Sequence, residues 1–198
     1  MSALKKLVSA LLVLTLAVSG GLLAWHGLHR TSAAPPVGQT QTPTVPAPPA
    51  SVPDTVSTLC VAGDLVMHIP IINSCRTDDG YDFTGLFDEA RPYYESADYA
   101  AACIETTFNG PPYSGFPQFC APDQLAGDLK SVGLDLLSTA SNHSLDTWFS
   151  GLTRTLDVLD GAGLDHVGTY RTQEERDTVK VIDVGGIRLA VLAYTYGT

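Results

Sequence analysis

Basic residues are scarce in this sequence. The 198-residue chain has 11 Lys and Arg residues against 21 Asp and Glu residues. Three of the basic residues, Lys5, Lys6 and Arg30, flank an N-terminal apolar segment that contains no acid, so 8 basic and 21 acidic residues remain, a net charge of −13. Such a surface repels nucleic acid and anionic lipid. It also disfavours loose binding of a polyanion unless metal ions or a further basic segment intervene.

Charge is absent altogether from Leu7 to Trp25. These 19 residues approach the ~20 that a helix needs to cross a bilayer, and Lys5 and Lys6 before them favour a cytoplasmic N-terminus. The segment has no acidic or amide residue, which argues against a buried amphipathic helix. A cleaved signal peptide stays open, but Ser32-Ala33-Ala34 is a weak cleavage site. We therefore predict a signal anchor over residues 1–30 that holds the rest of the chain outside the cytoplasmic membrane.

Large side chains and charges are rare from Thr31 to Ser57, where Pro, Thr, Ala and Ser dominate. Such a segment cannot form a core and predicts an extended spacer. It leaves residues 58–198 as one globular domain.

Short apolar runs alternate with helical patterns after the spacer. The predicted strands are 58–62, ended by Gly63, then 99–104, 135–139, 165–168, 179–184 and 187–194. The predicted helices are 85–95, 122–132 and 148–162. Gly185-Gly186 predicts a hairpin between the last two strands. The β-α-β-α-β order predicts an α/β fold with a largely parallel sheet and a ligand site at the carboxyl ends of its strands.

Polar residues gather at three of those ends. They are Asp64 and His68 after the first strand, Glu105 after the second, and Asn142, His143 and Asp146 after the third. Clustered carboxylates repel one another without a cation, and oxygen and imidazole ligands suit Mn, Zn, Fe or Mg. The pattern therefore predicts a divalent metal site.

Each residue also has a plain structural alternative. Asp64 and Asp146 could cap helices, His68 could be a loop histidine, Glu105 could be solvated, and Asn142-His143 could form a turn. All of these alternatives holding together is less probable than any one alone.

Seven segments in order resemble the CapA family of bacterial capsule synthesis proteins, which is linked to poly-γ-glutamate and looks like part of the calcineurin-like metallophosphatase superfamily. The segments are Gly-Asp-Leu-Val-Met-His-Ile-Pro-Ile (63–71), Tyr-Asp-Phe-Thr-Gly-Leu-Phe (81–87), Ser-Ala-Asp-Tyr (96–99), Ile-Glu-Thr (104–106), Tyr-Ser-Gly-Phe-Pro (113–117), Ser-Thr-Ala-Ser-Asn-His-Ser-Leu-Asp (138–146) and Ala-Tyr-Thr-Tyr-Gly-Thr (193–198). The resemblance implies a metallophosphatase-like layered sandwich.

Carried over to this sequence, the resemblance implies that Asp64, Glu105 and Asn142 bind metal, together with His68. It implies that His143 stabilises charge or supplies a proton at the scissile group, oriented by Asp146. The implied reaction is hydrolysis or transfer at a phosphoester or an amide.

Two positions depart from the family pattern, and the chain is short for the family. Cys103 stands where relatives commonly have Asn, which puts full metal loading in question, and Ser141 replaces the first Asn of an Asn-Asn-His motif. Family members continue beyond the position of Thr198 with further histidine ligands. We therefore expect a C-terminally truncated fragment with an incomplete, layered domain, poor solubility and no activity alone.

Four cysteines outside the membrane allow three disulfide pairings. Cys75 and Cys120 sit in the two long loops near the predicted site, at positions where the family usually has other residues, so a Cys75–Cys120 bridge is the preferred pairing. Cys60 and Cys103 fall in strands and fit small buried apolar residues.

Two functions compete on this basis. One is an extracytoplasmic, metal-dependent hydrolase or transferase acting on a cell-surface polymer, favoured by the Asn-His-x-x-Asp arrangement. The other is a non-catalytic component that binds or exports a capsule polymer within its synthesis complex, favoured by Cys103. A remnant with neither role is a third alternative.

Overall fold

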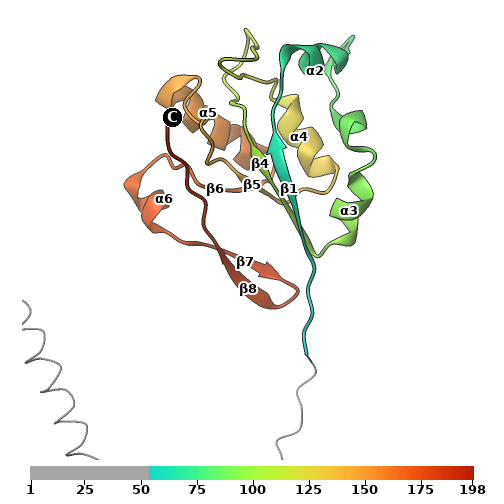
Figure 1. Cartoon of the computed structure of the whole chain (residues 1–198), viewed down its shortest axis with the longest axis vertical. Helices are drawn as coiled ribbons and strands as arrows, with labels where there is room; N and C mark the ends of the chain where they lie inside the picture. Colours follow the sequence, from blue (N-terminus) through green and yellow to red (C-terminus); the bar gives the residue numbers. More distant parts are fainter. Residues whose placement is uncertain (1–53) are drawn as a thin grey trace, which may run out of the picture. The chain divides into compact units, whose positions relative to one another are not determined.

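The structure, a computed structural model, describes residues 54–198. Its centre is a four-stranded parallel sheet in the order β1-β4-β5-β6 (Figure 1). The strands are β1 (Leu59–Leu65), β4 (Tyr99–Ile104), β5 (Leu136–Ser138) and β6 (Asp165–Val167). The α/β fold with a parallel sheet is confirmed, and the carboxyl ends of all four strands lie at one edge.

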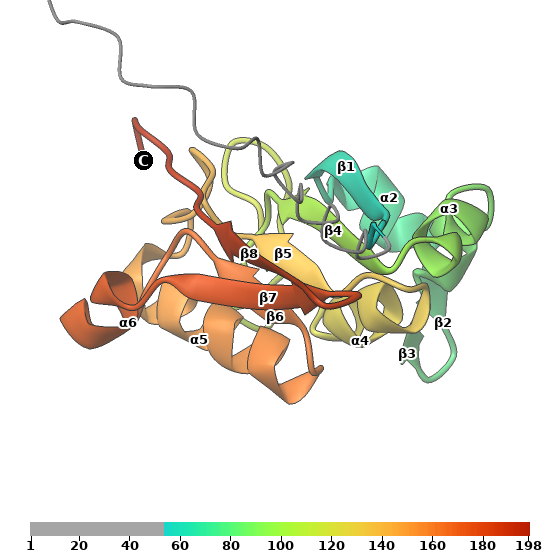
Figure 2. The ribbon, with the colours of Figure 1, turned by 90° about the horizontal axis from the view of Figure 1, so that it is seen from below.

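Helices cover one face of this sheet, and a hairpin lies on the other (Figure 2). The helices are α3 (Arg91–Ser96), α4 (Gln124–Ser131) and α5 (Trp148–Gly161). The hairpin consists of β7 (Lys180–Val184) and β8 (Ile187–Val191), which form a separate two-stranded antiparallel sheet. Gly185 and Gly186 at its turn both have positive φ, which glycine tolerates without steric cost, so the predicted hairpin is confirmed.

Strand alternation explains the two layers of the core. In β4, Ala100, Ala102 and Ile104 join the cluster under the helices, whereas Tyr99 and Ala101 join the cluster under the hairpin. The helix side is filled by large apolar side chains such as Leu125, Leu129 and Leu159. Burying each of these contributes about 1.5–3 kcal/mol.

Short elements lie between the main ones. They are α2 (Ile69–Ser74), the hairpin of β2 (Arg76–Thr77) and β3 (Gly80–Tyr81), the 3-10 helix η1 (Thr84–Phe87) and α6 (Gln173–Asp177). The single helix predicted over 85–95 is wrong, because it divides into η1 and α3. Pro92 lies in the first turn of α3, where its missing N–H is harmless, and it would disrupt a continuous helix.

The hairpin is tied to the parallel sheet by an ion pair. Lys180 on β7 contacts Asp165 on β6, and the phenol of Tyr99 donates a hydrogen bond to the same carboxylate (2.9 Å). Burial alone would raise the pKa of Asp165, but Lys180 and Tyr99 together hold this pKa below its ordinary value. Burial and Asp165 raise the pKa of Tyr99.

Within residues 54–198, no helix is long and apolar enough to cross a membrane. The predicted anchor at 1–30 and nearly all of the predicted spacer lie outside the described residues.

Candidate functional site

A bulge in β1 determines where Asp64 points. Val61 pairs with Ala101 and Asp64 pairs with Cys103, so β1 contains one residue more than β4 between these two pairs. Because side chains alternate along a strand, the extra residue turns Asp64 to the same face as Cys103. The expectation that Gly63 ends the strand is therefore wrong: Gly63 lies within β1, in the irregular stretch.

Asp64, Cys103 and Ser138 form a row across β1, β4 and β5, on the hairpin side of the sheet. The thiol of Cys103 faces both neighbours. Its burial, followed by the charge and hydrogen bonding of Asp64 and the charge of Glu105, raises the pKa of Cys103 to about 11. The thiol is therefore protonated at neutral pH and shares its surroundings with two carboxylates.

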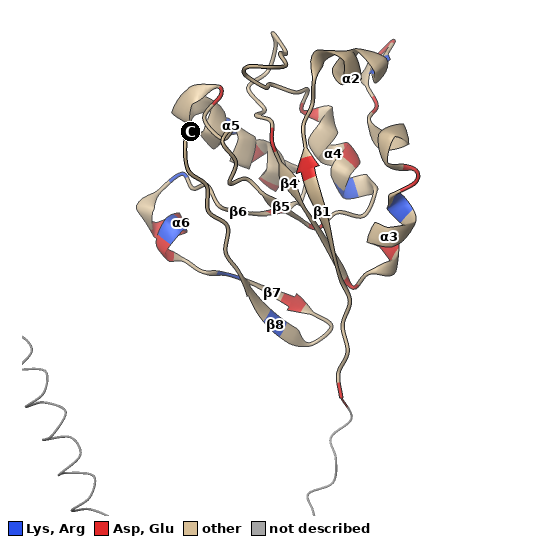
Figure 3. Ribbon diagram, in the orientation of Figure 1, with Lys and Arg blue, Asp and Glu red and all other residues tan. Residues whose placement is uncertain are grey.

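Glu105 continues β4 beyond its last strand residue. Its N–H donates to the carbonyl of Leu65 (3.1 Å), so the two strand ends stay side by side where Asp64 and Glu105 emerge. Figure 3 shows acidic positions at the ends of β1 and β4, with the nearest Lys and Arg on other elements. The site is thus electronegative, as a cation site requires.

His143 and Asp146 form a hydrogen-bonded pair in the loop between β5 and α5. Nδ1 of His143 lies 2.9 Å from Oδ2 of Asp146, and the two side chains are 17% and 10% exposed. Asp146 Oδ2 also accepts a hydrogen bond from the backbone N–H of Phe119 (2.5 Å). The predicted contact between His143 and Asp146 is present, and Asp146 holds the ring through one nitrogen and leaves the other free.

Phe119 connects the two candidate histidines. Its buried ring meets His68 edge-on at 5.3 Å between centroids and meets His143 edge-on at 4.7 Å. Gly115 lies so close to His68 that a Cβ there would stand 2.6 Å from its Nδ1. Phe119 was not among the predicted site residues, because a phenylalanine within a loop carries no sequence signal of its own.

The loop that carries Asn142 and His143 is held by hydrogen bonds of the Ser144 hydroxyl group. Ser144 Oγ contacts the carbonyls of Thr139 (2.7 Å) and Ser141 (2.6 Å) and accepts from the N–H of Ser141 (2.9 Å). Gly168, directly after β6, packs closely against this loop: a Cβ added at Gly168 would lie 2.6 Å from the Cβ of Ala140. The position of His143 is therefore fixed by its neighbours on both sides.

The predicted ligands are of residue types that suit a divalent metal. Within the part of the chain that the structure describes, no hydrogen bond or ion pair engages the side chains of His68, Glu105 or Asn142. No three His, Cys, Asp or Glu side chains in residues 54–198 are arranged to hold a metal ion. The ligand set Asp64, His68, Glu105 and Asn142 stays a prediction.

The predicted Cys75–Cys120 disulfide is wrong, because all four cysteines are free thiols. The Sγ of Cys120 points to the carbonyl of Gly110 (3.4 Å), and the Sγ of Cys75 lies 3.9 Å from the hydroxyl of Ser74. Both thiols are buried, and each makes a contact with a residue within ten positions of it in the chain. Cys60 and Cys103 are half-buried.

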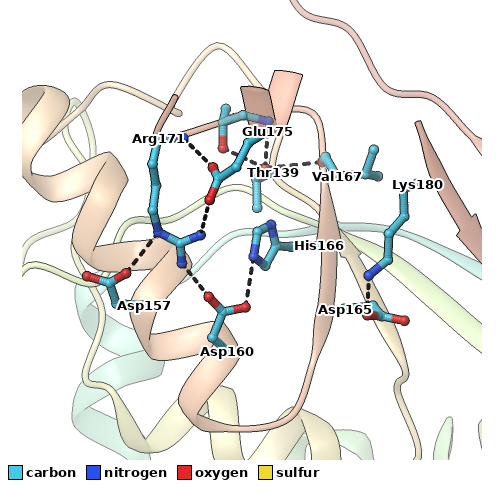
Figure 4. Close-up of polar contacts among 10 residues, drawn as sticks. Thr139, Asp157, Asp160, Asp165, His166, Val167, Arg171, Glu175 and Lys180 are labelled. Atoms are coloured by element: carbon cyan, nitrogen blue, oxygen red, sulfur yellow. Dashed lines mark hydrogen bonds and ion pairs between the residues drawn. The ribbon is translucent and has the colours of Figure 1, made fainter. Parts of the chain in front are cut away.

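A second polar cluster joins α5, β6 and α6 (Figure 4). Arg171 binds Asp157 (2.9 Å), Asp160 and Glu175 (2.9 Å), and Asp160 also contacts His166. Every cationic group here is matched by a carboxylate, so the cluster fixes the β6–α6 loop and does not form an anion site.

Sequence comparisons relate this chain to bacterial proteins of capsule synthesis. The family described as "Bacterial capsule synthesis protein PGA_cap" matches residues 58–198. The uncharacterized proteins y4sH and y4uA of Sinorhizobium fredii are each 26% identical over 145 residues, covering 69% of this chain and 30% of theirs. The capsule biosynthesis protein CapA of Bacillus anthracis is 25% identical over 147 residues, covering 70% of this chain and 34% of its own length. The chain thus spans about a third of the length of these relatives.

Proposed function

Because the chain belongs to the PGA_cap family of bacterial capsule synthesis proteins, we propose that it acts on a capsule polymer outside the cytoplasmic membrane, as a metal-dependent hydrolase or transferase of the calcineurin-like type. The anchoring is supported by the uncharged run from Leu7 to Trp25 after Lys5 and Lys6. In this proposal the Pro-rich spacer supplies the reach between membrane and polymer.

The observation that carries the catalytic part is the His143–Asp146 pair (2.9 Å). An imidazole held through one nitrogen by a carboxylate presents its other nitrogen in a fixed direction. Such a group can give a proton to a leaving atom or stabilise charge that develops on the scissile group. A protein that only guides a polymer has no need of an oriented imidazole.

In this proposal Asp64, Glu105 and Asn142 would hold the cation, together with His68. When bound, a divalent ion supplies a water of lowered pKa and polarises the group under attack. The chain's own residues bind the ion and shield it from the apolar core. The ring of Phe119 contacts both His68 and His143.

The charge of the chain supports a cation in the site for a second reason. The part after the apolar segment carries a net charge of −13, and an anionic polymer such as poly-γ-glutamate would be repelled by it. Divalent ions at the carboxylate-rich edge reduce this repulsion where the polymer approaches.

The test is an assay of the purified full chain with Mn²⁺ on poly-γ-glutamate and on bis(p-nitrophenyl) phosphate, beside His143→Ala. In this proposal the chain is active, against the expectation that it is inactive alone: cleavage needs the ion and falls at least about 100-fold in His143→Ala. Equal cleavage in both proteins, or cleavage that survives EDTA, contradicts the proposal. Metal-dependent retention of the polymer without cleavage would instead favour the non-catalytic binding component.

A further inference from the structure

A small cavity lies beneath the candidate site, between the end of β4, the start of α5 and the loops after β5 and β6. Its volume is about 10 Å³, and Ile104 and Leu152 contribute the apolar part of its wall. The rest of the wall consists of residues with a hydroxyl group: Thr106, Thr107, Thr139, Ser144, Thr155 and Thr169. An interior site with so many hydroxyl groups is chemically suited to a polar ligand.

Thr106 is the residue of this wall that needs explanation. The residue is 4% exposed, and its buried Oγ1 has no hydrogen-bond partner among residues 54–198. A buried hydroxyl without a partner is costly, and native proteins seldom retain one without an ordered water or another ligand beside it. We therefore expect a hydrogen-bond acceptor beside the hydroxyl of Thr106, within the cavity.

The neighbouring hydroxyls show which other hydrogen-bonding positions are free. Thr139 is saturated: its Oγ1 donates to the carbonyl of Val167 (3.1 Å) and accepts from the N–H (3.0 Å) and the hydroxyl (2.7 Å) of Thr169. Thr155 donates to the carbonyl of Gly151 (2.8 Å) and accepts from a single N–H (2.9 Å), so one of its lone pairs is free. Thr169, which donates to Thr139, keeps lone pairs as well.

We propose that this cavity binds one water molecule as an internal structural ligand. The water accepts a hydrogen bond from Thr106 Oγ1 and donates to free lone pairs of the surrounding hydroxyls, for which Thr155 and Thr169 are the best placed. A cavity of this size admits about one water, and a buried water typically makes two to four such bonds. The site requires neither a metal ion nor the capsule polymer, and so does not depend on the proposed function.

The bound water would link, by hydrogen bonds, segments that lie next to the candidate site. Thr106 follows Glu105 directly, while Thr139 and Ser144 support the loop that carries His143. A water shared by Thr106, Thr155 and Thr169 joins the end of β4 to α5 and to the loop after β6, where no direct hydrogen bond from the Thr106 side chain does so within the described chain. Thr169 in turn contacts Thr139 at the start of the β5–α5 loop.

The test compares the full chain with Thr106→Val, which keeps the shape of the side chain and removes its hydroxyl. If the hydroxyl binds the water, the substitution lowers Tm by roughly 2–6 °C. If the hydroxyl is simply unpaired, the substitution raises Tm, which overturns the proposal. Thr153→Val, on the exposed side of α5, measures the intrinsic effect of the exchange.

A direct observation decides the matter even if Thr106→Val fails to fold. A crystal structure of the wild-type chain at a resolution that shows ordered solvent is expected to contain one water within 3.2 Å of Thr106 Oγ1. A cavity without solvent density, or a Thr106 hydroxyl turned to a protein carbonyl, contradicts the inference.

Discussion

His143 and Asp146 lie three residues apart and share a 2.9 Å hydrogen bond, and both side chains are largely shielded from water. The carboxylate is itself fixed, because it also accepts from the backbone N–H of Phe119. The loop after β5 thus supplies an imidazole and the acid that orients it, and the loop between β4 and α4 supplies the N–H that fixes the acid. This pair is the firmest geometric support for a chemical role of the strand-end loops.

Asp146→Asn removes the charge that sets the tautomer of His143 while keeping a similar shape. We expect the metal-dependent hydrolysis rate to fall about 10–100-fold, as for other residues that orient a functional histidine. The ¹⁵N chemical shifts of His143 should move with it, because the Nδ1 proton loses its carboxylate partner. Asp157→Asn, at an exposed acid of α5 that binds Arg171, is the matched control. Unchanged rates and shifts in Asp146→Asn would remove the orienting role.

Phe119→Leu should affect both candidate histidines at once. The ring lies edge-on to His68 and to His143, so its loss removes ring-current effects on both imidazoles. We expect the ring ¹H shifts of the two histidines to change together, with a loss of about 1–2 kcal/mol in the free energy of unfolding. Phe87→Leu, at a buried ring in the main core, serves as the control. A change at only one histidine would contradict the shared contact.

Cys103 should be an unreactive thiol in the metal-free protein. Its pKa of about 11 leaves roughly 0.1% thiolate at pH 8. Because only the thiolate is nucleophilic, the thiol reacts slowly. Alkylation of Cys103 by iodoacetamide, followed by peptide mass spectrometry, should accelerate about tenfold for each pH unit up to about pH 10. Because the folded pKa lies above the ordinary value of 9.0, the fold should also lose stability from about pH 9 to pH 11. Rapid alkylation at pH 7 would contradict the described surroundings.

Lys180→Met breaks the ion pair that ties β7 to Asp165 on β6. Both groups are partly exposed, so we expect a loss of only about 0.5–1 kcal/mol at pH 7 in urea unfolding. The pKa of Asp165 is lowered in the folded state, so its contribution exists above its unfolded pKa and disappears as the pH falls through the folded value. The difference between the two proteins should therefore shrink as the pH falls and vanish once Asp165 is protonated in the folded protein. Arg188→Met, at an exposed cation of β8, should show no such pH dependence.

Much of the fold follows from patterns within the sequence. The strand over Tyr99–Ile104 has its predicted bounds, and the helix beginning at Trp148 buries Leu152, Leu156 and Leu159 as its spacing implies. Short elements were missed, because six-residue helices such as α2 carry too few turns to show a period. The bulge that orients Asp64 was missed because it is a property of pairing between β1 and β4, which no local pattern encodes.

The metal ligands stay a prediction, and of the contacts around them the sequence indicated only the one between His143 and Asp146. The resemblance to the CapA family implied Asp146 as the partner of His143, and the two groups do meet. The contact between the Cys103 thiol and Asp64, and the contacts of the Phe119 ring with two histidines, depend on segments far apart in the chain. Long-range contacts of this kind are set by tertiary packing and not by spacing.

The central claim is that strand ends carrying Asp64, Glu105 and Asn142 bind a divalent cation. Titration calorimetry of the metal-free full chain with Mn²⁺ tests it most directly, beside Asp64→Ala and the exposed control Asp79→Ala. We expect saturable binding by the wild type and by Asp79→Ala, and an affinity at least about tenfold weaker in Asp64→Ala. Equal binding by all three proteins, or no binding by the wild type, would contradict the claim.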